Sequence, residues 1–237
     1  MLPAFRGRDY GVYLLQGVAT IPAQPAAPPV PAVIRVMFFI DGQNLYHACE
    51  DHFGHGNIHP HLLAQEMLKG RQLAGIRFYT GIHEAHIRPK ANATMRHRLA
   101  VMEQNGVYTW DHNLKYSDCE IVDHDVPCCS HGRPKVDTVK KGREKGIDLR
   151  IGLDMIRLAR HGEYDVASLV SQDTDLNQAV DELMLLRAEL DLWLACENVY
   201  PYNPASGLPN FRLLSCPRWH IIDQAMFDRI RDDTDYR

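Results

Sequence analysis

From about residue 33 onward, short apolar runs alternate along the chain with segments whose apolar residues recur at helical spacing. The runs that have the length and composition of strands are 35–40, 75–81, 106–113, 164–171 and 189–195. Helical spacing covers 44–53, 59–69, 89–104, 147–161, 175–187 and 219–230. Because strands that alternate with helices pair in parallel through right-handed crossovers, the sequence predicts an α/β fold. We expect a doubly wound, mainly parallel sheet of about five strands with helices on both faces.

The residues before this alternating region have a different composition. Residues 21–32 read IPAQPAAPPVPA, which favours an extended, unpacked leader. We therefore expect residues 1–32 to lie outside the fold, and residues 33–237 to form the domain, with 197–237 as a C-terminal loop and closing helix. Met37 lies inside the first apolar run and leaves open a translation start at that point.

Composition narrows the class of protein. The chain has 26 Lys and Arg against 30 Asp and Glu, a net charge of −4, which argues against sequence-blind coating of nucleic acid. The six cysteines are too scattered for a disulfide framework and indicate reduced thiols. No apolar run reaches the length of a membrane span, and Asp9 and Gln16 interrupt the N-terminal stretch that a signal peptide would need. These features predict a cytoplasmic protein without a membrane partner.

Acidic residues cluster where the predicted strands end. Asp41 follows the first strand, and Asp173 and Asp175 follow the strand at 164–171. Asp148 stands at the start of the long helix. Each residue taken singly suits a helix cap or a tight turn. Because the carboxyl ends of parallel strands meet at one edge of a sheet, however, we expect these four side chains to share one pocket.

Several carboxylates in one pocket repel one another, so each needs a proton or a cation. A hard divalent ion suits such an all-oxygen site, which predicts bound Mg²⁺ or Mn²⁺. Asn44 would add a neutral oxygen or hold the attacking water. A site of this kind performs phosphate chemistry, because the metal polarises a phosphoryl oxygen and lowers the pKa of water.

Three stretches of the chain resemble the signature blocks of NYN-domain proteins, which belong to the PIN-like nuclease superfamily and include the bacterial LabA/DUF88 group. The stretches are FIDGQN, EKGIDLRIGLDMIRLA and YDVASLVSQDTDL, and they occur in the family's order. The resemblance covers about residues 33–195. It implies a parallel α/β sandwich with a Mg²⁺- or Mn²⁺-dependent ribonuclease site.

The resemblance assigns roles residue by residue. Asp41 and Asn44 take the first-strand role, Asp148 is the mid-chain acid, and Asp173 and Asp175 are the last pair. Asp154 matches a position that is commonly acidic. The chain departs from the family pattern at Gln172 and Thr174, where many members carry glycine, and at Leu176, where many carry phenylalanine. These changes spare the acids but alter the loop that surrounds the site.

A basic run precedes the mid-chain acid. Residues 133–145 read RPKVDTVKKGREK, and they favour either a flank that grips RNA phosphates or a solvated loop. The expected substrate-binding residues are Lys140, Lys141, Arg143, Lys145 and, in the strand-end loop, Ser171. A weaker basic group comprises Arg88, Lys90, Arg96 and Arg98. Three aromatic residues, Tyr46, Tyr79 and Trp110, suit either base stacking or core packing.

Thiol and imidazole groups gather in the segment that carries no clear period. Cys119, His124, Cys128, Cys129 and His131 are soft ligands that suit a structural zinc ion. Their spacing matches no standard zinc ribbon or finger, so the zinc site remains an alternative. The segment 114–136 is expected to be a loop or a small hairpin.

The leading hypothesis is a metal-dependent endoribonuclease that hydrolyses RNA phosphodiester bonds. The alternative is a non-catalytic RNA-binding or regulatory module that retains the acidic pocket. A phosphatase ranks last, because Asp41-Gly42-Gln43 lacks the second aspartate of an Asp-x-Asp nucleophile motif. An exposed sheet edge or the closing helix leaves a homodimer open.

Overall fold

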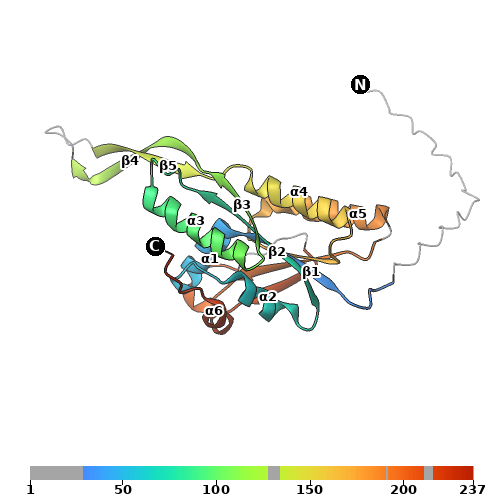
Figure 1. Ribbon diagram of the computed structural model, residues 1–237. Helices are drawn as coiled ribbons and strands as arrows, with labels where there is room; N and C mark the ends of the chain where they lie inside the picture. Colours follow the sequence, from blue (N-terminus) through green and yellow to red (C-terminus); the bar gives the residue numbers. More distant parts are fainter. Residues whose placement is uncertain (1–28, 128–133, 191, 211–215, 237) are drawn as a thin grey trace, which may run out of the picture.

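The central element is a six-stranded parallel sheet with the strand order β3-β2-β1-β6-β7-β8 (Figure 1). The computed structural model describes residues 29–127, 134–190, 192–210 and 216–236, and it describes only the backbone of 119–127 and 134–139. The strands of this sheet are β1 (Arg35–Asp41), β2 (Gln72–Ile82), β3 (Tyr108–Asn113), β6 (Val166–Val170), β7 (Ala195–Pro201) and β8 (Arg218–Ile222). The α/β class and the parallel pairing are as predicted, with one strand more than expected.

Helices cover both faces of the sheet. One face carries α1 (Gly42–Phe53), α2 (Pro60–Leu68), α3 (Pro89–Gln104) and α6 (Gln224–Ile230), and the other carries α4 (Ile147–Arg160) and α5 (Asn177–Glu189). Short 3-10 turns are η1 (Thr174–Leu176) and η2 (Pro204–Ser206). Within the described residues, none of the helices has the length and apolar character needed to cross a bilayer.

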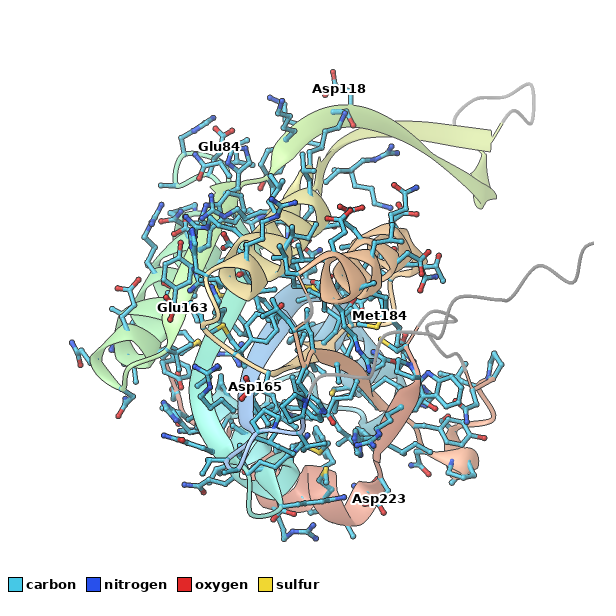
Figure 2. All side chains as sticks on the ribbon, turned by 90° about the vertical axis from the view of Figure 1, so that its right-hand side faces the viewer. Glu84, Asp118, Glu163, Asp165, Met184 and Asp223 are labelled. Atoms are coloured by element: carbon cyan, nitrogen blue, oxygen red, sulfur yellow. The ribbon has the colours of Figure 1, made fainter. Side chains whose placement is uncertain are left out.

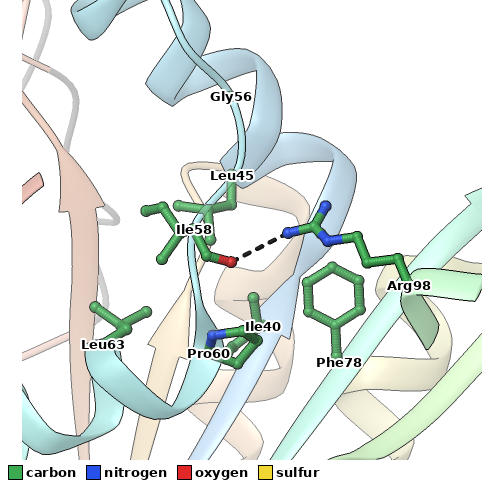
Figure 3. Close-up of a pocket in the computed structure, with 9 residues that line it drawn as sticks. Ile40, Leu45, Gly56, Ile58, Pro60, Leu63, Phe78 and Arg98 are labelled. Carbon is green, nitrogen blue, oxygen red and sulfur yellow. Dashed lines mark hydrogen bonds between the residues drawn. The ribbon is translucent and has the colours of Figure 1, made fainter. Parts of the chain in front are cut away.

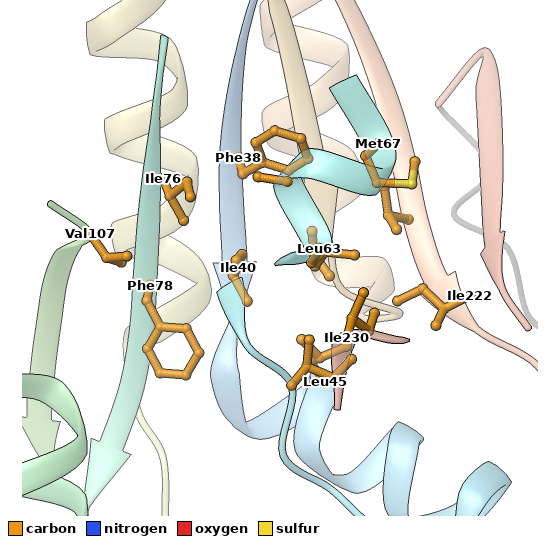
Figure 4. Packing of buried hydrophobic residues seen from close by; sticks show 14 of the residues in the cluster. Phe38, Ile40, Leu45, Leu63, Met67, Ile76, Phe78, Val107, Ile222 and Ile230 are labelled. Carbon is orange, nitrogen blue, oxygen red and sulfur yellow. The ribbon is translucent and has the colours of Figure 1, made fainter. Parts of the chain in front are cut away.

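β1 supplies both hydrophobic cores, because successive side chains of a strand point to opposite faces of the sheet. Phe38 and Ile40 pack with Leu45 of α1 and Leu63 of α2 on the first face (Figure 4). Phe39 packs on the second face, against α4 and α5. The sheet is therefore buried on both sides, which explains why β1 reads as a continuous apolar run rather than an alternating one.

An antiparallel hairpin separates β3 from α4. It consists of β4 (Lys115–Pro127) and β5 (Pro134–Arg143), and it extends away from the body of the domain in Figures 1 and 2, where Asp118 marks it. Figure 2 views the sheet from the end at which β1 and β6 begin, near Asp165, so the carboxyl ends of the strands lie on the far side. The expected loop or small hairpin is thus a longer hairpin.

The last predicted strand, 189–195, is wrong: β7 begins at Ala195 and occupies the start of the segment expected to be a loop. Glu197 and Asn198 misled the prediction because they are polar, yet both are fully buried in β7. Glu197 receives hydrogen bonds from Arg71 Nη1 and Nη2, each at 3.0 Å. Asn198 Nδ2 donates to the carbonyl oxygens of Leu169 at 3.0 Å and Ser171 at 2.8 Å. Tertiary partners therefore allow a polar sequence in a central strand.

The closing helix expected over 219–230 is also wrong in its first half. β8 occupies Arg218–Ile222 and pairs in parallel with β7, and only Gln224–Ile230 is helical. Asp223 separates the two elements because its carboxylate caps α6 by accepting a hydrogen bond from Met226 N at 2.8 Å.

Two of the sequence hypotheses involve residues that the structure does not describe. Residues 1–28 of the leader lie outside the described residues, as do Cys128, Cys129 and His131 of the zinc alternative. The side chains of Cys119 and His124 lie outside them too. The zinc site therefore stays a prediction.

A buried charge cluster joins β7 to its neighbours. Glu197 lies between Arg71, which precedes β2, and His220 of β8, with its carboxylate 3.1 Å from His220 Nε2. Burial alone would raise the pKa of Glu197, but the hydrogen bonds and charges of Arg71 and His220 outweigh burial and lower the pKa.

We expect Arg71→Met to destabilise the protein by about 3 kcal/mol at pH 7, because it leaves the buried Glu197 carboxylate without its main partner. Since the pKa of Glu197 is lowered, the pair stabilises the fold above the usual glutamate pKa and loses that effect as pH falls. Urea unfolding should therefore show a smaller difference in unfolding free energy between wild type and Arg71→Met at pH 4 than at pH 7. The control Arg88→Met, at an exposed arginine, should change stability by less than about 0.5 kcal/mol. Equal losses in the two variants would contradict a role for the ion pair.

Candidate metal centre

An acidic pocket of about 440 Å³ opens at the carboxyl ends of β1 and β6. Its walls come from the end of β1, from α1, from Glu144 before α4 and Asp148 in its first turn, and from the loop after β6. The residues that line it are Asp41, Gln43, Asn44, His47, Ala48, Asp51, Glu144, Asp148, Gln172 and Asp173. The strand-end prediction is confirmed to this extent: Asp41, Asp148 and Asp173 face one pocket.

Asp41 is the last residue of β1 and also the N-cap of α1. Its Oδ1 accepts a hydrogen bond from Asn44 N at 3.0 Å, and its Oδ2 accepts one from Ser171 Oγ at 3.3 Å. Only 3% of the residue is exposed. Burial raises the pKa of Asp41 to about 6 against the lowering effect of the Asn44 hydrogen bond, and the charges of Asp148 and Asp173 raise it further. Asp41 therefore caps α1 and also lines the acidic pocket.

Hydrogen bonds tie the loop after β6 to the start of α1. Asn44 Oδ1 accepts from Gln172 N at 2.8 Å, and Ser171 Oγ accepts from Asp173 N at 3.1 Å. Ser171 is buried, and its hydroxyl both donates to Asp41 and accepts from the loop. Its contacts therefore place it as a link between the two strand ends. Asn44 was expected to offer its side-chain oxygen to the metal or the attacking water, but this oxygen is already an acceptor within the protein.

Three carboxylates approach one another closely enough to share a metal ion. Asp148, Asp173 and Asp175 each offer an oxygen, and these three atoms lie within 4.8 Å of one another. Asp148 stands in the first turn of α4, and burial, followed by the charges of Asp173 and Asp175, raises its pKa. A hydrogen bond holds the loop that carries Asp173 and Asp175: Asp173 Oδ1 accepts from Asp175 N at 2.9 Å. Asp175 is the most exposed of the three.

Glu144 is the site residue that the sequence did not identify. It lines the acidic pocket, and its Oε1 accepts a hydrogen bond from Gly81 N at the end of β2. Burial raises the pKa of Glu144 to about 7, and the charge of Asp41 is the next cause. Its only signals in the sequence were its place inside the EKGID block and its negative charge at the end of a basic run. Its partner Gly81 is 63 residues away, so only the fold reveals the contact.

Asp154 lies apart from the acidic pocket. Its carboxylate is buried on the face of α4 that packs on the sheet, where Arg150 and Arg157 each approach it at 3.1 Å and Arg77 at 3.4 Å. Tyr79 O–H donates to it at 3.0 Å, and the Tyr79 side chain is fully buried. Paired with cations and a phenol rather than with other acids, Asp154 has the environment of a structural residue.

The predicted basic residues do not line the acidic pocket. Lys140, Lys141 and Arg143 are exposed on β5, and Lys145 is exposed in the turn before α4. Successive side chains of a strand point to opposite faces, so Lys141 and Arg143 lie on one face of β5, and Lys140 and Gly142 lie on the other. The role expected for these residues in substrate binding therefore stays a prediction.

The donor set fits a hard divalent cation. All the charged ligands are carboxylate oxygens, and burial together with mutual repulsion raises the pKa of Asp41, Glu144 and Asp148. Gln172 also lines the pocket. Its Nε2, a hydrogen-bond donor and not a metal ligand, is buried without a hydrogen-bond partner among the described residues. A bound cation would reduce the repulsion between these carboxylates. Without a cation, protonation reduces it, which is why their pKa values are raised.

A parallel α/β sheet with clustered acids at its carboxyl edge has the architecture in which open sheets hold their ligands, and it is the nuclease-like fold of the family that the chain matches. The profile described as "NYN domain" matches residues 35–201, and the chain belongs to the NYN domain family. None of the curated proteins matches it. A crystal structure of a protein of unknown function from Vibrio parahaemolyticus is similar with 16% identity and a TM-score of 0.49, covering 85% of this chain and 97% of that one.

We expect Asp41→Asn to stabilise the metal-free protein by about 2 kcal/mol at pH 8 and to leave its stability nearly unchanged at pH 4. The pKa of Asp41 is raised from 3.8 to about 6, so the wild-type fold loses stability as pH rises through this window and a buried carboxylate must ionise. Urea unfolding in EDTA measures the difference. The exposed Asp181→Asn should show no such pH dependence. An Asp41→Asn protein less stable than wild type at pH 8 would contradict this electrostatic account.

Proposed function

We propose that the protein is a metal-dependent endoribonuclease of the LabA/DUF88 branch that hydrolyses phosphodiester bonds of cytoplasmic RNA. The observation that carries this proposal is the convergence of carboxylate oxygens of Asp148, Asp173 and Asp175 within 4.8 Å of one another. Asp148 and Asp173 also line an open pocket together with Asp41 and Glu144. The NYN family and its nuclease-like fold support the same chemistry.

Asp148, Asp173 and Asp175 would hold Mg²⁺ or Mn²⁺, with Asp41 and Glu144 at the adjoining wall of the pocket. A divalent ion supplies Lewis-acid polarisation of a phosphoryl oxygen and lowers the pKa of water. An ion could exchange with solvent at this site, since the pocket is open and Asp175 is exposed.

The other polar residues have roles that follow from their contacts. Glu144, with a pKa of about 7, is suited to accept a proton from the attacking water near neutral pH. The amide nitrogen of Asn44, a residue that lines the pocket, would donate to a non-bridging phosphate oxygen. Ser171 acts as a positioning residue, because it connects Asp41 to the backbone of Asp173.

The RNA backbone would leave the pocket along the hairpin. Lys141, Arg143 and Lys145 are exposed there, and Lys140 lies on the other face of β5. Contacts from such residues to phosphates fix the position of RNA without reading its bases, and they make binding sensitive to salt.

A non-catalytic RNA-binding module is the second candidate, and Gln172 is the observation that favours it. The side chain of Gln172 lines the acidic pocket, where a glycine would leave more room. A protein of this kind would bind RNA without metal and cleave none.

We expect Asp41→Asn and Asp173→Asn to reduce Mn²⁺-dependent cleavage of single-stranded RNA by about 100-fold or more. Loss of a residue that supports a metal ligand already reduces activity about 10- to 100-fold, and a group inside the pocket should matter at least as much. Product formation from a labelled RNA, measured at saturating Mn²⁺, tests this.

The matched control is Asp181→Asn, which removes an exposed carboxylate on α5 and should cleave like wild type. Equal cleavage by wild type, Asp41→Asn and Asp173→Asn would eliminate the proposed site. RNA binding in EDTA without any cleavage by wild type in Mg²⁺ or Mn²⁺ would support the non-catalytic module instead.

A further inference from the structure

A second pocket, of about 470 Å³, adjoins the acidic pocket. It lies between α1, the end of β2, α3 and the base of the hairpin. Gln43 and His47 of α1 line both pockets, so the two share a wall. Gly81 forms a second connection, because it lines this pocket while its N–H donates to Glu144 of the acidic pocket.

The chemistry of this second pocket is opposite to that of the first. Apolar and aromatic side chains dominate its walls, among them Tyr46, Phe78, Ile82, Met95 and Leu114. None of the described residues that line it is an aspartate or a glutamate. A few polar groups set among apolar walls are typical of a site for a small organic group rather than for a metal ion.

Arg98 is the fixed cation of this pocket. It is 6% exposed, and it donates through Nη1 to Asn57 Oδ1 at 2.7 Å and through Nη2 to Ile58 O at 3.1 Å (Figure 3). Its guanidinium lies 5.7 Å from the centroid of the Phe78 ring. The Nε atom is buried without a hydrogen-bond partner among the described residues, and Asp232 lies 3.9 Å from it.

Arg98 and Phe78 also line the small cavity whose residues Figure 3 shows, but the volume of that cavity is only about 10 Å³. That space holds no more than a water molecule. Any larger ligand of Arg98 must therefore enter from the second pocket.

We propose that the second pocket binds one unpaired nucleobase of the RNA whose phosphodiester bond occupies the acidic pocket. This inference rests on the proposed function and adds a substrate class to it: RNA with an unpaired base beside the bond that is cut. A sugar links the base of a nucleotide to its phosphate, so one nucleotide spans two adjoining sites. Apolar and aromatic walls suit the faces of a base, and Gln43, Thr80 and His83 add polar side chains at the walls for its edge.

The pocket also predicts discrimination against duplex RNA. A paired base is stacked within its helix and reaches such a pocket only after it is unpaired. Single-stranded segments, loops and bulges present their bases freely, which makes them the preferred substrates.

The test fills the pocket from α3 without touching the acids. Ala91 lines the pocket and is half-buried, whereas Ala100 lies on the same helix, is exposed and does not line the pocket. The two variants Ala91→Trp and Ala100→Trp therefore make the same chemical change inside and outside the proposed site. Thermal unfolding midpoints establish that both fold, and Thr94→Phe serves as the pocket-filling variant if Ala91→Trp does not.

The measurement is the Kd of a short fluorescein-labelled single-stranded RNA in Ca²⁺, by anisotropy, with an abasic oligonucleotide of the same length as comparison. We expect the pocket-filling variant to weaken RNA binding about 10-fold or more, the scale of a lost base-stacking contact, and Ala100→Trp to bind like wild type. The abasic oligonucleotide should bind wild type and the pocket-filling variant equally.

The outcomes separate the two proposals. Equal Kd values for wild type and the pocket-filling variant, or no RNA binding by wild type, would overturn the base pocket; the nuclease proposal is judged separately by cleavage in Mn²⁺. Pocket-dependent binding by a wild type that cleaves no RNA would support the base pocket and defeat the nuclease. Pocket-dependent binding together with cleavage that fails in Asp173→Asn supports both.

Discussion

Parallel pairing of β1 with β6 is the constraint on which the site depends. Its register runs from Val36 opposite Val166 to Ile40 opposite Val170, so the strands end side by side and release Asp41 and Ser171 at the same edge. The hydrogen bond from Ser171 Oγ to Asp41 joins residues 130 positions apart in the sequence. A slip of one residue in this register would send the site side chains to the wrong face, because side chains alternate along a strand.

The same edge concentrates carboxylates, and among the described residues that line the acidic pocket there is no lysine or arginine. Asp41, Glu144 and Asp148 all have raised pKa values, and burial is the largest cause for each. Asp154 shows the contrast: it is as buried as Asp41, yet three arginines and Tyr79 surround it. Acids that share a pocket with other acids, rather than with arginines, indicate a site that accepts an external cation.

Much of this arrangement could be predicted from local sequence, because an acid directly after an apolar run is recognisable as an acid at the end of a strand. Asp41 closes an apolar run, and Asp173 follows another, so the rule for parallel sheets brings them together. Glu144 could not be predicted in this way, since its role depends on a contact with Gly81 across the fold. β7 was missed for a related reason: Glu197 and Asn198 are polar in sequence but satisfied by distant partners. The second pocket depends on α1, β2, α3 and the hairpin together, and no single segment indicates it.

The most direct test of the acidic site is a crystal of the protein soaked in Mn²⁺ and measured at the manganese absorption edge. The account predicts an anomalous peak in the pocket, about 2 Å from carboxylate oxygens of Asp148 and Asp173 and within reach of Asp175. An empty pocket under conditions in which Mn²⁺ occupies other surface sites would contradict it, as would a peak bound only by exposed residues elsewhere.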